Sequence, residues 1–345
     1  MKKLLFVYNP RSGKGLIKAH LSAVLETFSA AGYDVTVYPT KEPLDGCNMV
    51  TRRAAEFDLI VCSGGDGTLD EIVAGIMQSG VKRPVGYIPA GSTNDFASSV
   101  GISKNMEQAA REVVNGEIFS CDIGRFNDDY FVYVAAFGFL TSVSYQTDQE
   151  LKNVLGHAAY IVEGMKQVGS MKNYHLRVES EEFSDEGDFI YGMVSNSNSI
   201  AGIKGLPGKN VELNDGLLEV MLVRAPQTIV DWQELLAAIL MQEENSRNVV
   251  RFKTRKLKIF SGEPVAWTRD GENGGEHTVV ELENLKQVLD IMVQSRLAQE
   301  CEPQQQGPVQ QKMGLGILAE SEIVSEEEFA ELLSIEKPEE VYPEE

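Results

Sequence analysis

Two short stretches of the sequence contain residues whose types and spacing could hold phosphate groups and accept a proton. The first is Gly64-Gly65-Asp66-Gly67-Thr68, which directly follows the apolar run Leu59–Cys62. Three glycines in five residues permit positive φ angles and a close approach of backbone N–H groups to phosphate oxygens. The second is Asp270-Gly271-Glu272, in which a carboxylate could act as a general base. An ordinary turn rich in Gly and Asp is the competing interpretation of each stretch.

A helix predicted after the first stretch would place it at a helix N-terminus. Apolar residues recur with helical spacing through Thr68–Met77, at Leu69, Ile72, Val73 and Ile76. The helix dipole favours anions at that end. Asp66 would repel phosphates unless a divalent cation lay between them, so this loop indicates a nucleotide with a bound metal ion.

Two further apolar strands end in polar loops that contain glycine. Asn9–Gly15 follows the predicted strand Lys2–Tyr8, and Pro89–Phe96 follows the predicted strand Val85–Ile88. The first of these loops is not a Walker A loop, because it lacks the first Gly and the Lys-Ser/Thr ending. Ligands of open α/β sheets bind at the carboxyl ends of the parallel strands. We therefore expect all three loops to share one site.

Five motifs resemble, in order along the chain, those of the diacylglycerol kinase catalytic-domain family, close to the soluble bacterial lipid kinases. They are NPRSGKG, SGGDGTLDE, PAGSTNDFA, LNDGLLEV and RDGENGG, and the match runs from about residue 2 to residue 293. GGDGT by itself is shared with NAD kinases and is related to the phosphofructokinase loop. The series of five motifs is strongly specific for the diacylglycerol kinase catalytic-domain family.

The resemblance implies ATP as phosphate donor and Mg²⁺ as cofactor. The residues that it implies around ATP are Asn9, Arg11, Ser12, Gly13, Thr40, Gly64, Gly65, Asp66, Gly67, Thr68, Glu71 and Ser92. Asp66 and Asp95 resemble the acidic residues of a water-bridged Mg²⁺ network behind the phosphates. Glu272 would be the general base.

A second, structural Mg²⁺ is implied in the later part of the chain. The side chains of Glu212 and Asp215 and the carbonyl oxygen of Leu217 would be its ligands. Two positions depart from the family pattern. Glu212 stands where Asp is expected, although its longer side chain can still bind Mg²⁺, and Asp70 stands where Asn is usual. Asp70 would add negative charge near the phosphates or cap a helix turn.

Composition and pattern predict two domains and a tail. The chain has 345 residues and is 43% hydrophobic, enough for two cores. Residues 1–122 alternate strand and helix, which is typical of a nucleotide-binding α/β domain with a parallel sheet flanked by helices. Residues 123–293 are predicted to form an antiparallel β-sandwich that binds the lipid acceptor, as in the NAD kinase/diacylglycerol kinase-like fold. Its expected strands are Tyr130–Ala136, Tyr174–Glu179, Ile190–Ser195, Leu217–Val223, Phe252–Phe260 and Thr278–Leu282, with helices at Ala158–Val168 and Ile229–Met241.

Residues 294–345 are predicted to be an acidic, largely flexible tail. A capping-box pattern at Ser325–Glu328 indicates a short amphipathic helix with Phe329, Leu332 and Leu333 on its apolar face. That helix could dock on the body of the protein or on an unknown partner, and disorder is the competing interpretation.

The charge and the remaining residues limit the partners and the location. The formal net charge of −21 argues against a nucleic-acid partner and works against contact with an anionic membrane surface. No apolar run of about 18 residues and no signal peptide is present, so we expect a cytoplasmic protein. The four cysteines and four histidines lack metal-binding spacing.

The sequence therefore predicts an ATP- and Mg²⁺-dependent lipid kinase that works peripherally at the inner membrane surface. It would phosphorylate the primary hydroxyl of a membrane lipid, with diacylglycerol as first candidate and phosphatidic acid as product. Undecaprenol, ceramide, a sphingoid base and monoacylglycerol are alternative acceptors. NAD kinase and a non-catalytic regulator that binds nucleotide or lipid are alternative functions, and the resemblance is compatible with a homodimer.

Overall fold

The first part of the chain folds as a parallel sheet. In the computed structural model its strands lie in the order β4-β3-β1-β2, with bounds β1 (Lys2–Tyr8), β2 (Tyr33–Pro39), β3 (Leu59–Gly64) and β4 (Val85–Pro89). All three pairings are parallel. Strands β3 and β4 are buried along their whole length, as is typical of central strands in a sheet covered on both faces.

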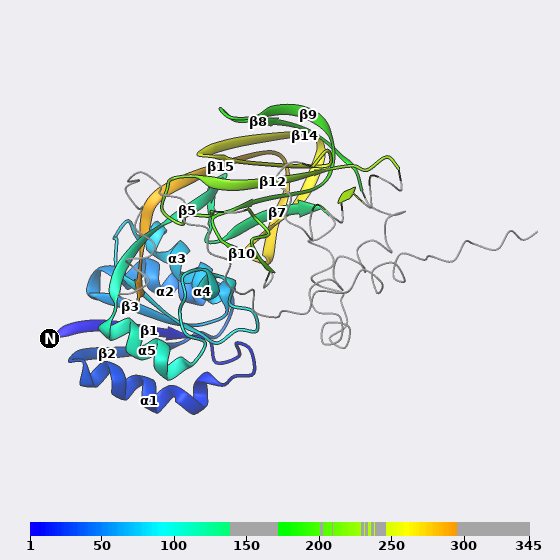
Figure 1. Ribbon diagram of the computed structural model, residues 1–345. Helices are drawn as coiled ribbons and strands as arrows, with labels where there is room; N and C mark the ends of the chain where they lie inside the picture. The colour runs from blue at the N-terminus through cyan, green and yellow to red at the C-terminus, as the bar shows by residue number, and fades with distance from the viewer. Residues whose placement is uncertain are drawn as a thin grey trace, which may run out of the picture. The chain divides into compact units, whose positions relative to one another are not determined.

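Helices cover this sheet on both sides. They are α1 (Ile17–Ala30), α2 (Asp45–Arg53) with a 3-10 turn after it (Ala54–Glu56), α3 (Asp66–Ser79), α4 (Asp95–Ser99) and α5 (Met106–Asn115). Helices α1 and α5 pack together on one side, and α2 and α3 on the other (Figure 1). The predicted apolar face of α3 is confirmed, because Leu69, Ile72, Val73 and Ile76 are all buried.

Antiparallel strands make up most of the rest. Their bounds are β5 (Glu117–Phe126), β6 (Asp129–Phe131), β7 (Val134–Gly138), β8 (Tyr174–Glu179), β9 (Ser184–Ser195), β12 (Leu218–Arg224), β13 (Val249–Thr254), β14 (Lys256–Arg269) and β15 (Glu272–Val293), with a small pair β10 (Ser199–Ile200) and β11 (Ile203–Lys204). Apolar side chains from these strands, including Phe131, Phe137 and Trp267, form a second core. The protein therefore has a mixed α/β fold.

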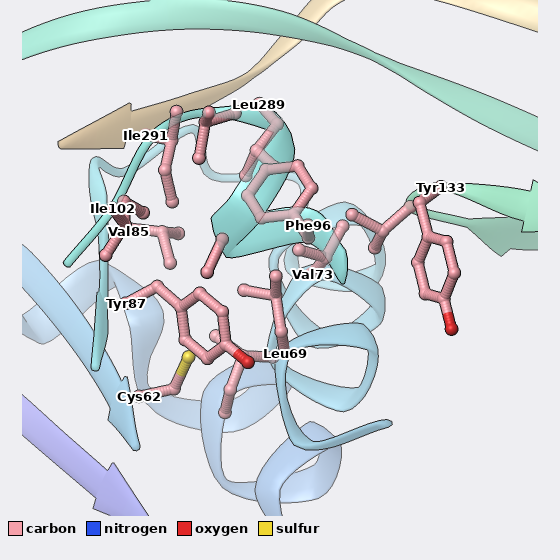
Figure 2. Close-up of a cluster of buried hydrophobic side chains, with 14 of the residues drawn as sticks. Cys62, Leu69, Val73, Val85, Tyr87, Phe96, Ile102, Tyr133, Leu289 and Ile291 are labelled. Carbon is pink, nitrogen blue, oxygen red and sulfur yellow. The ribbon is translucent and has the colours of Figure 1, made fainter. Parts of the chain in front are cut away.

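The long strand β15 connects the two parts. Near its start it pairs with β14, and towards its end it pairs antiparallel with β5. Ile291 also pairs with Val85 of β4, so β15 completes the parallel sheet. Figure 2 shows Leu289 and Ile291 of β15 in the same core as Tyr87 and Phe96. Because one hydrogen-bonded sheet runs through both parts, the domain boundary at residue 122 and the sandwich arrangement stay predictions.

Four strand predictions need correction, and one of them is Ile190–Ser195, which is only the second half of β9. Tyr130–Ala136 is divided between β6 and β7, because the backbone N–H groups of residues 132–134 bind the Asp270 carboxylate. Phe252–Phe260 is interrupted between β13 and β14 at a turn in which Thr254 Oγ1 accepts the Lys256 N–H. Thr278–Leu282 is only the middle of β15.

The structure describes residues 1–138, 172–200, 203–208, 210–228, 231, 234, 235, 238 and 246–294. The predicted helix Ala158–Val168, the tail helix and most of Ile229–Met241 lie outside these residues. No helix in the described ranges combines the length and the apolar character needed to cross a bilayer.

Candidate active site

The three polar loops meet at the carboxyl edge of the parallel sheet. The Asn9 N–H donates to Ser63 O at 2.8 Å, and the Ala90 N–H donates to Gly64 O at 2.7 Å. The hydroxyl of the buried Tyr87 donates to the same Gly64 carbonyl at 3.2 Å. The loop after β3 is therefore held between the loop after β1 and the loop after β4, as the strand order requires.

Glycine is needed in these loops mainly because other atoms of the protein approach its Cα closely. A Cβ on Gly64 would lie 2.2 Å from Thr68 Oγ1, and a Cβ on Gly91 would lie 2.6 Å from Gly65 Cα. The expected positive φ angles are wrong for Gly64, Gly65 and Gly67, because Gly67 is already helical and none of the three has a positive φ. Gly13 does, at +54°.

Asp66 and Asp95 lie side by side behind the loops. Asp66 is the first residue of α3, and its carboxylate accepts the backbone N–H groups of Asp95 at 3.1 Å and Phe96 at 3.3 Å. Burial raises the pKa of Asp66 to about 6, and the neighbouring Asp95 charge acts in the same direction. Asp95 is 3% exposed and accepts the Ser199 hydroxyl at 3.0 Å. Two neighbouring carboxyl groups, one buried and one partly buried, beside the glycine loops suit a divalent cation.

Glu272 lies at the start of α3 although it is some 200 residues away in sequence. It is exposed, it opens β15, and a Cβ on Gly67 would lie 3.2 Å from its Oε1. The predicted base is thus placed directly beside the GGDGT loop.

Asp270 fixes the turn that carries Glu272. Its buried carboxylate accepts the N–H groups of Val132 at 2.5 Å, Tyr133 at 3.0 Å and Val134 at 2.9 Å. The RDGE motif contains Asp270 without indicating this role, because the three donors lie 136 to 138 residues earlier in the chain.

The other predicted ATP residues fall into two groups. Asn9, Arg11, Ser12 and Ser92 are in the loops themselves, and Arg11 and Ser92 are exposed. Thr40 follows β2, where its N–H donates to Tyr8 O at 2.9 Å.

Glu71 is directed away from the phosphate loop. Its Oε1 accepts the Leu44 N–H at 2.9 Å, and its Oε2 accepts the Gly46 N–H at 3.0 Å. The carboxylate therefore holds the start of α2 and shapes the segment after Thr40.

Known proteins with this sequence pattern are named as diacylglycerol kinases. Residues 3–126 match the profile of the diacylglycerol kinase catalytic domain. The diacylglycerol kinase of Bacillus subtilis (strain 168) is 32% identical over 277 residues, which cover 80% of this chain and 91% of that protein. That of Staphylococcus carnosus (strain TM300) is 30% identical over 292 residues, covering 84% and 94%. The chain belongs to the diacylglycerol kinase catalytic-domain family.

Solved structures agree with this assignment at the level of the fold. A crystal structure of a diacylglycerol kinase from Bacillus anthracis str. Sterne superposes with a TM-score of 0.69 at 20% identity, covering 86% of this chain and 98% of that one. Another from the same organism gives a TM-score of 0.72 at 24% identity, covering 86% and 96%. The protein is a kinase.

The residues predicted to hold a structural Mg²⁺ in this kinase already have other partners. Asp215 Oδ1 accepts the Leu217 N–H at 2.8 Å, and its Oδ2 is 3.3 Å from the Lys253 ammonium. The Leu217 carbonyl accepts the Asn284 amide at 2.9 Å, and Glu212 is exposed. The predicted ligand set of this Mg²⁺ stays a prediction.

Lys253 supplies the positive charge at this place in the kinase. Its ammonium is 3.1 Å from the carboxylate of Glu219, which lies opposite it in the β12–β13 pair and is 3% exposed, and 2.9 Å from the Asn210 carbonyl. Burial raises the pKa of Glu219 to about 7, and Lys253 opposes that rise. Sequence reasoning does not find this pair, since its only signal is one acidic residue within an apolar strand.

Proposed function

We propose that this kinase transfers the γ-phosphate of ATP to the primary hydroxyl of diacylglycerol and so forms phosphatidic acid. The observation that carries the proposal is the position of Glu272 beside Gly67, at the end of α3 where the phosphates would lie. The names of the relatives support diacylglycerol as the acceptor.

Each group of residues has a task in this reaction. The glycine loops and the N-terminus of α3 present backbone N–H groups to the phosphates. Asp66 and Asp95 would hold Mg²⁺, which neutralises charge on the phosphates when it is bound. Glu272 orients the acceptor hydroxyl and accepts its proton as the new P–O bond forms.

The acceptor determines where the kinase works. Diacylglycerol lies in a membrane, so the protein would contact the inner membrane surface peripherally while it works. We also propose that the kinase forms a homodimer and that its acidic tail binds a partner. The net charge of −21 favours acceptors presented in neutral lipid, because an anionic surface repels the protein.

Transfer of labelled γ-phosphate to lipids in neutral mixed micelles with Mg²⁺ tests the proposal. The acceptors compared are diacylglycerol, undecaprenol, ceramide, a sphingoid base and NAD. We expect labelled phosphatidic acid, and we expect Glu272→Gln to lower kcat by about 100-fold or more because the base is lost. Glu276→Gln is the matched control, since Glu276 is an exposed carboxylate on the same strand.

Three results would contradict the proposal. Labelled phosphate on another lipid would identify that lipid as the acceptor in place of diacylglycerol. Labelled phosphate on NAD would identify the protein as an NAD kinase. Binding of ATP without transfer to any acceptor would indicate a non-catalytic regulator. Equal activity of Glu272→Gln and Glu276→Gln would remove Glu272 from the role of base.

A further inference from the structure

A short polar segment from the antiparallel part of the fold reaches the carboxyl groups of the site. Residues Ser195–Ser199 run from the end of β9 into β10, and β10 lies against α4, the helix that begins at Asp95 (Figure 1). The Ser199 hydroxyl donates to Asp95 Oδ1 at 3.0 Å, and both residues are buried. None of the tasks proposed for the site residues uses this hydroxyl.

The hydroxyl protons of this segment have defined directions. Ser197 Oγ donates to the Ser199 carbonyl at 2.7 Å and accepts the Ser199 N–H at 3.2 Å. Because the one proton of the Ser197 hydroxyl is used in this way, Ser99 of α4 donates to Ser197 across the 2.7 Å between their oxygens. The backbone of Ser199 is thus held by Ser197, and its own hydroxyl proton goes to the carboxylate of Asp95, which can only accept.

The backbone of Asp95 is held from the side of the parallel sheet. Its N–H donates to Asp66 Oδ2 at 3.1 Å. The side chain of Asn94, the preceding residue, accepts the Gly91 N–H and donates to the Gly91 carbonyl, both at 2.9 Å. The loops after β3 and β4 therefore fix the main chain of Asp95, whereas a serine of the antiparallel part fixes its carboxylate.

The orientation of the Asp95 carboxylate matters for a bound cation. Asp66 and Asp95 repel each other when no cation lies between them, so the two carboxylates need other groups to hold them together. Groups that hydrogen-bond a ligating carboxylate orient it, and their loss typically costs about 10–100-fold in metal affinity or activity. The Ser199 hydroxyl is a group of this kind, since it occupies one oxygen of Asp95.

We propose that Ser199 is a positioning residue that holds the Asp95 carboxylate in the orientation in which it binds Mg²⁺ together with Asp66. This role rests on the proposed function, in which Asp66 and Asp95 hold the cation. The antiparallel part of the fold then supplies a residue on which the metal site of the nucleotide loops depends.

The test compares Ser199→Ala with Ser199→Thr in the full-length protein. Isothermal titration calorimetry measures ATP binding in Mg²⁺ and in EDTA, without lipid, so the readout is independent of catalysis. We expect Ser199→Ala to weaken ATP binding about tenfold in Mg²⁺ and hardly at all in EDTA. Ser199→Thr keeps the hydroxyl and should restore most of the affinity in Mg²⁺.

Ser99→Ala is the matched control. It also removes one hydroxyl between α4 and the Ser195–Ser199 segment, but the partner of that hydroxyl is Ser197 rather than Asp95. We expect Ser99→Ala and Ser199→Ala to lower Tm in EDTA by similar amounts, since each loses one hydrogen bond. Only Ser199→Ala should also lose ATP affinity in Mg²⁺.

Three results would overturn the proposal. The first is equal ATP affinity of Ser199→Ala and Ser99→Ala in Mg²⁺, and the second is a Ser199→Thr variant as defective as Ser199→Ala. The third is wild-type ATP binding that is the same in Mg²⁺ and in EDTA, because Asp95 would then hold no cation with the nucleotide. If the expected Mg²⁺ effects are seen but the wild type phosphorylates no acceptor, the proposed transfer fails and the role of Ser199 stands.

Discussion

At the scale of single residues, the site concentrates negative charge that other groups must neutralise. Asp95 and Asp270 are buried, Asp66 is partly buried, and Glu272 lies beside the N-terminal end of α3. Backbone N–H groups compensate the charges of Asp66 and Asp270. The phosphates of ATP would add further negative charge, which explains why a cation should bind with the nucleotide.

Protonation of Asp66 should compete with Mg²⁺. Because the pKa of Asp66 is raised to about 6, we expect the apparent Mg²⁺ affinity in the kinase assay to increase as the pH rises through about 6 and to level off above it. Asp66→Asn should lower that affinity by about tenfold or more and abolish this pH dependence. Mg²⁺ titrations of activity between pH 5 and pH 8 measure both effects. An unchanged Mg²⁺ requirement in the variant would exclude Asp66 from metal binding.

At the scale of elements, close contacts between loops and pairs across strands set the geometry. The loop after β4 can lie against the loop after β3 only because Gly91 and Gly65 lack side chains. In the antiparallel part, the cross-strand pair Glu219 and Lys253 joins β12 to β13 and reaches the loop of Asp215. The close contact between the loops and the cross-strand pair can each be removed by one substitution.

Gly91→Ala should separate two of the phosphate loops. Its Cβ would lie 2.6 Å from Gly65 Cα, so the backbone has to shift. We expect a loss of about 1–3 kcal/mol in stability and a rise in KM for ATP. Gly262→Ala is the control, because a Cβ at that exposed glycine meets no atom within 4 Å. Similar KM values for the two variants would show that the loops tolerate separation.

Lys253→Met should destabilise the β12–β13 region. It leaves the buried Glu219 and the half-buried Asp215 without their cation, at an expected cost of about 2 kcal/mol in unfolding free energy. Lys256→Met, at an exposed position on the next strand, serves for comparison. Thermal unfolding with Mg²⁺ or EDTA also tests the predicted metal ligands: equal responses of Glu212→Gln and wild type would exclude Glu212 from Mg²⁺ binding. A Mg²⁺-dependent rise in Tm that disappears in Glu212→Gln would instead place Mg²⁺ at this loop.

The sequence was informative where structure depends on near neighbours. The bounds of β1 and β8 and the apolar face of α3 follow from local periodicity, and three strand-end loops meet because parallel strands share an edge. The sequence was uninformative where a structural feature depends on a residue far away along the chain. The break between β6 and β7 and the direction of the Glu71 side chain both depend on groups 25 or more residues away.

At the scale of the whole molecule, Met1–Pro303 forms one compact unit. The parallel sheet is not finished by the residues that begin it, because β15 supplies the neighbour of β4. The core around Tyr87 likewise includes Leu289 and Ile291 (Figure 2). The first 122 residues therefore lack part of their own core.

A fragment of residues 1–122 should fail to fold stably by itself. It leaves the edge of β4 unpaired and exposes the apolar side chains that β15 covers, and such edges promote aggregation. We expect the fragment to aggregate on expression, whereas residues 1–303 remain monodisperse and retain ATP binding. Size-exclusion chromatography and circular dichroism compare them. A well-folded, ATP-binding fragment would show that β15 is dispensable for the first sheet.

The route of β15 also has a consequence for biosynthesis. A ribosome that has completed β4 must add roughly 200 more residues before Ile291 emerges, which takes on the order of 10–40 s at ordinary elongation rates. Throughout that interval the nascent chain carries an open strand edge and an incomplete core. Chaperone demand during translation should therefore be concentrated on this early sheet, and a slow codon or a premature stop before residue 291 should be far more harmful than one after it.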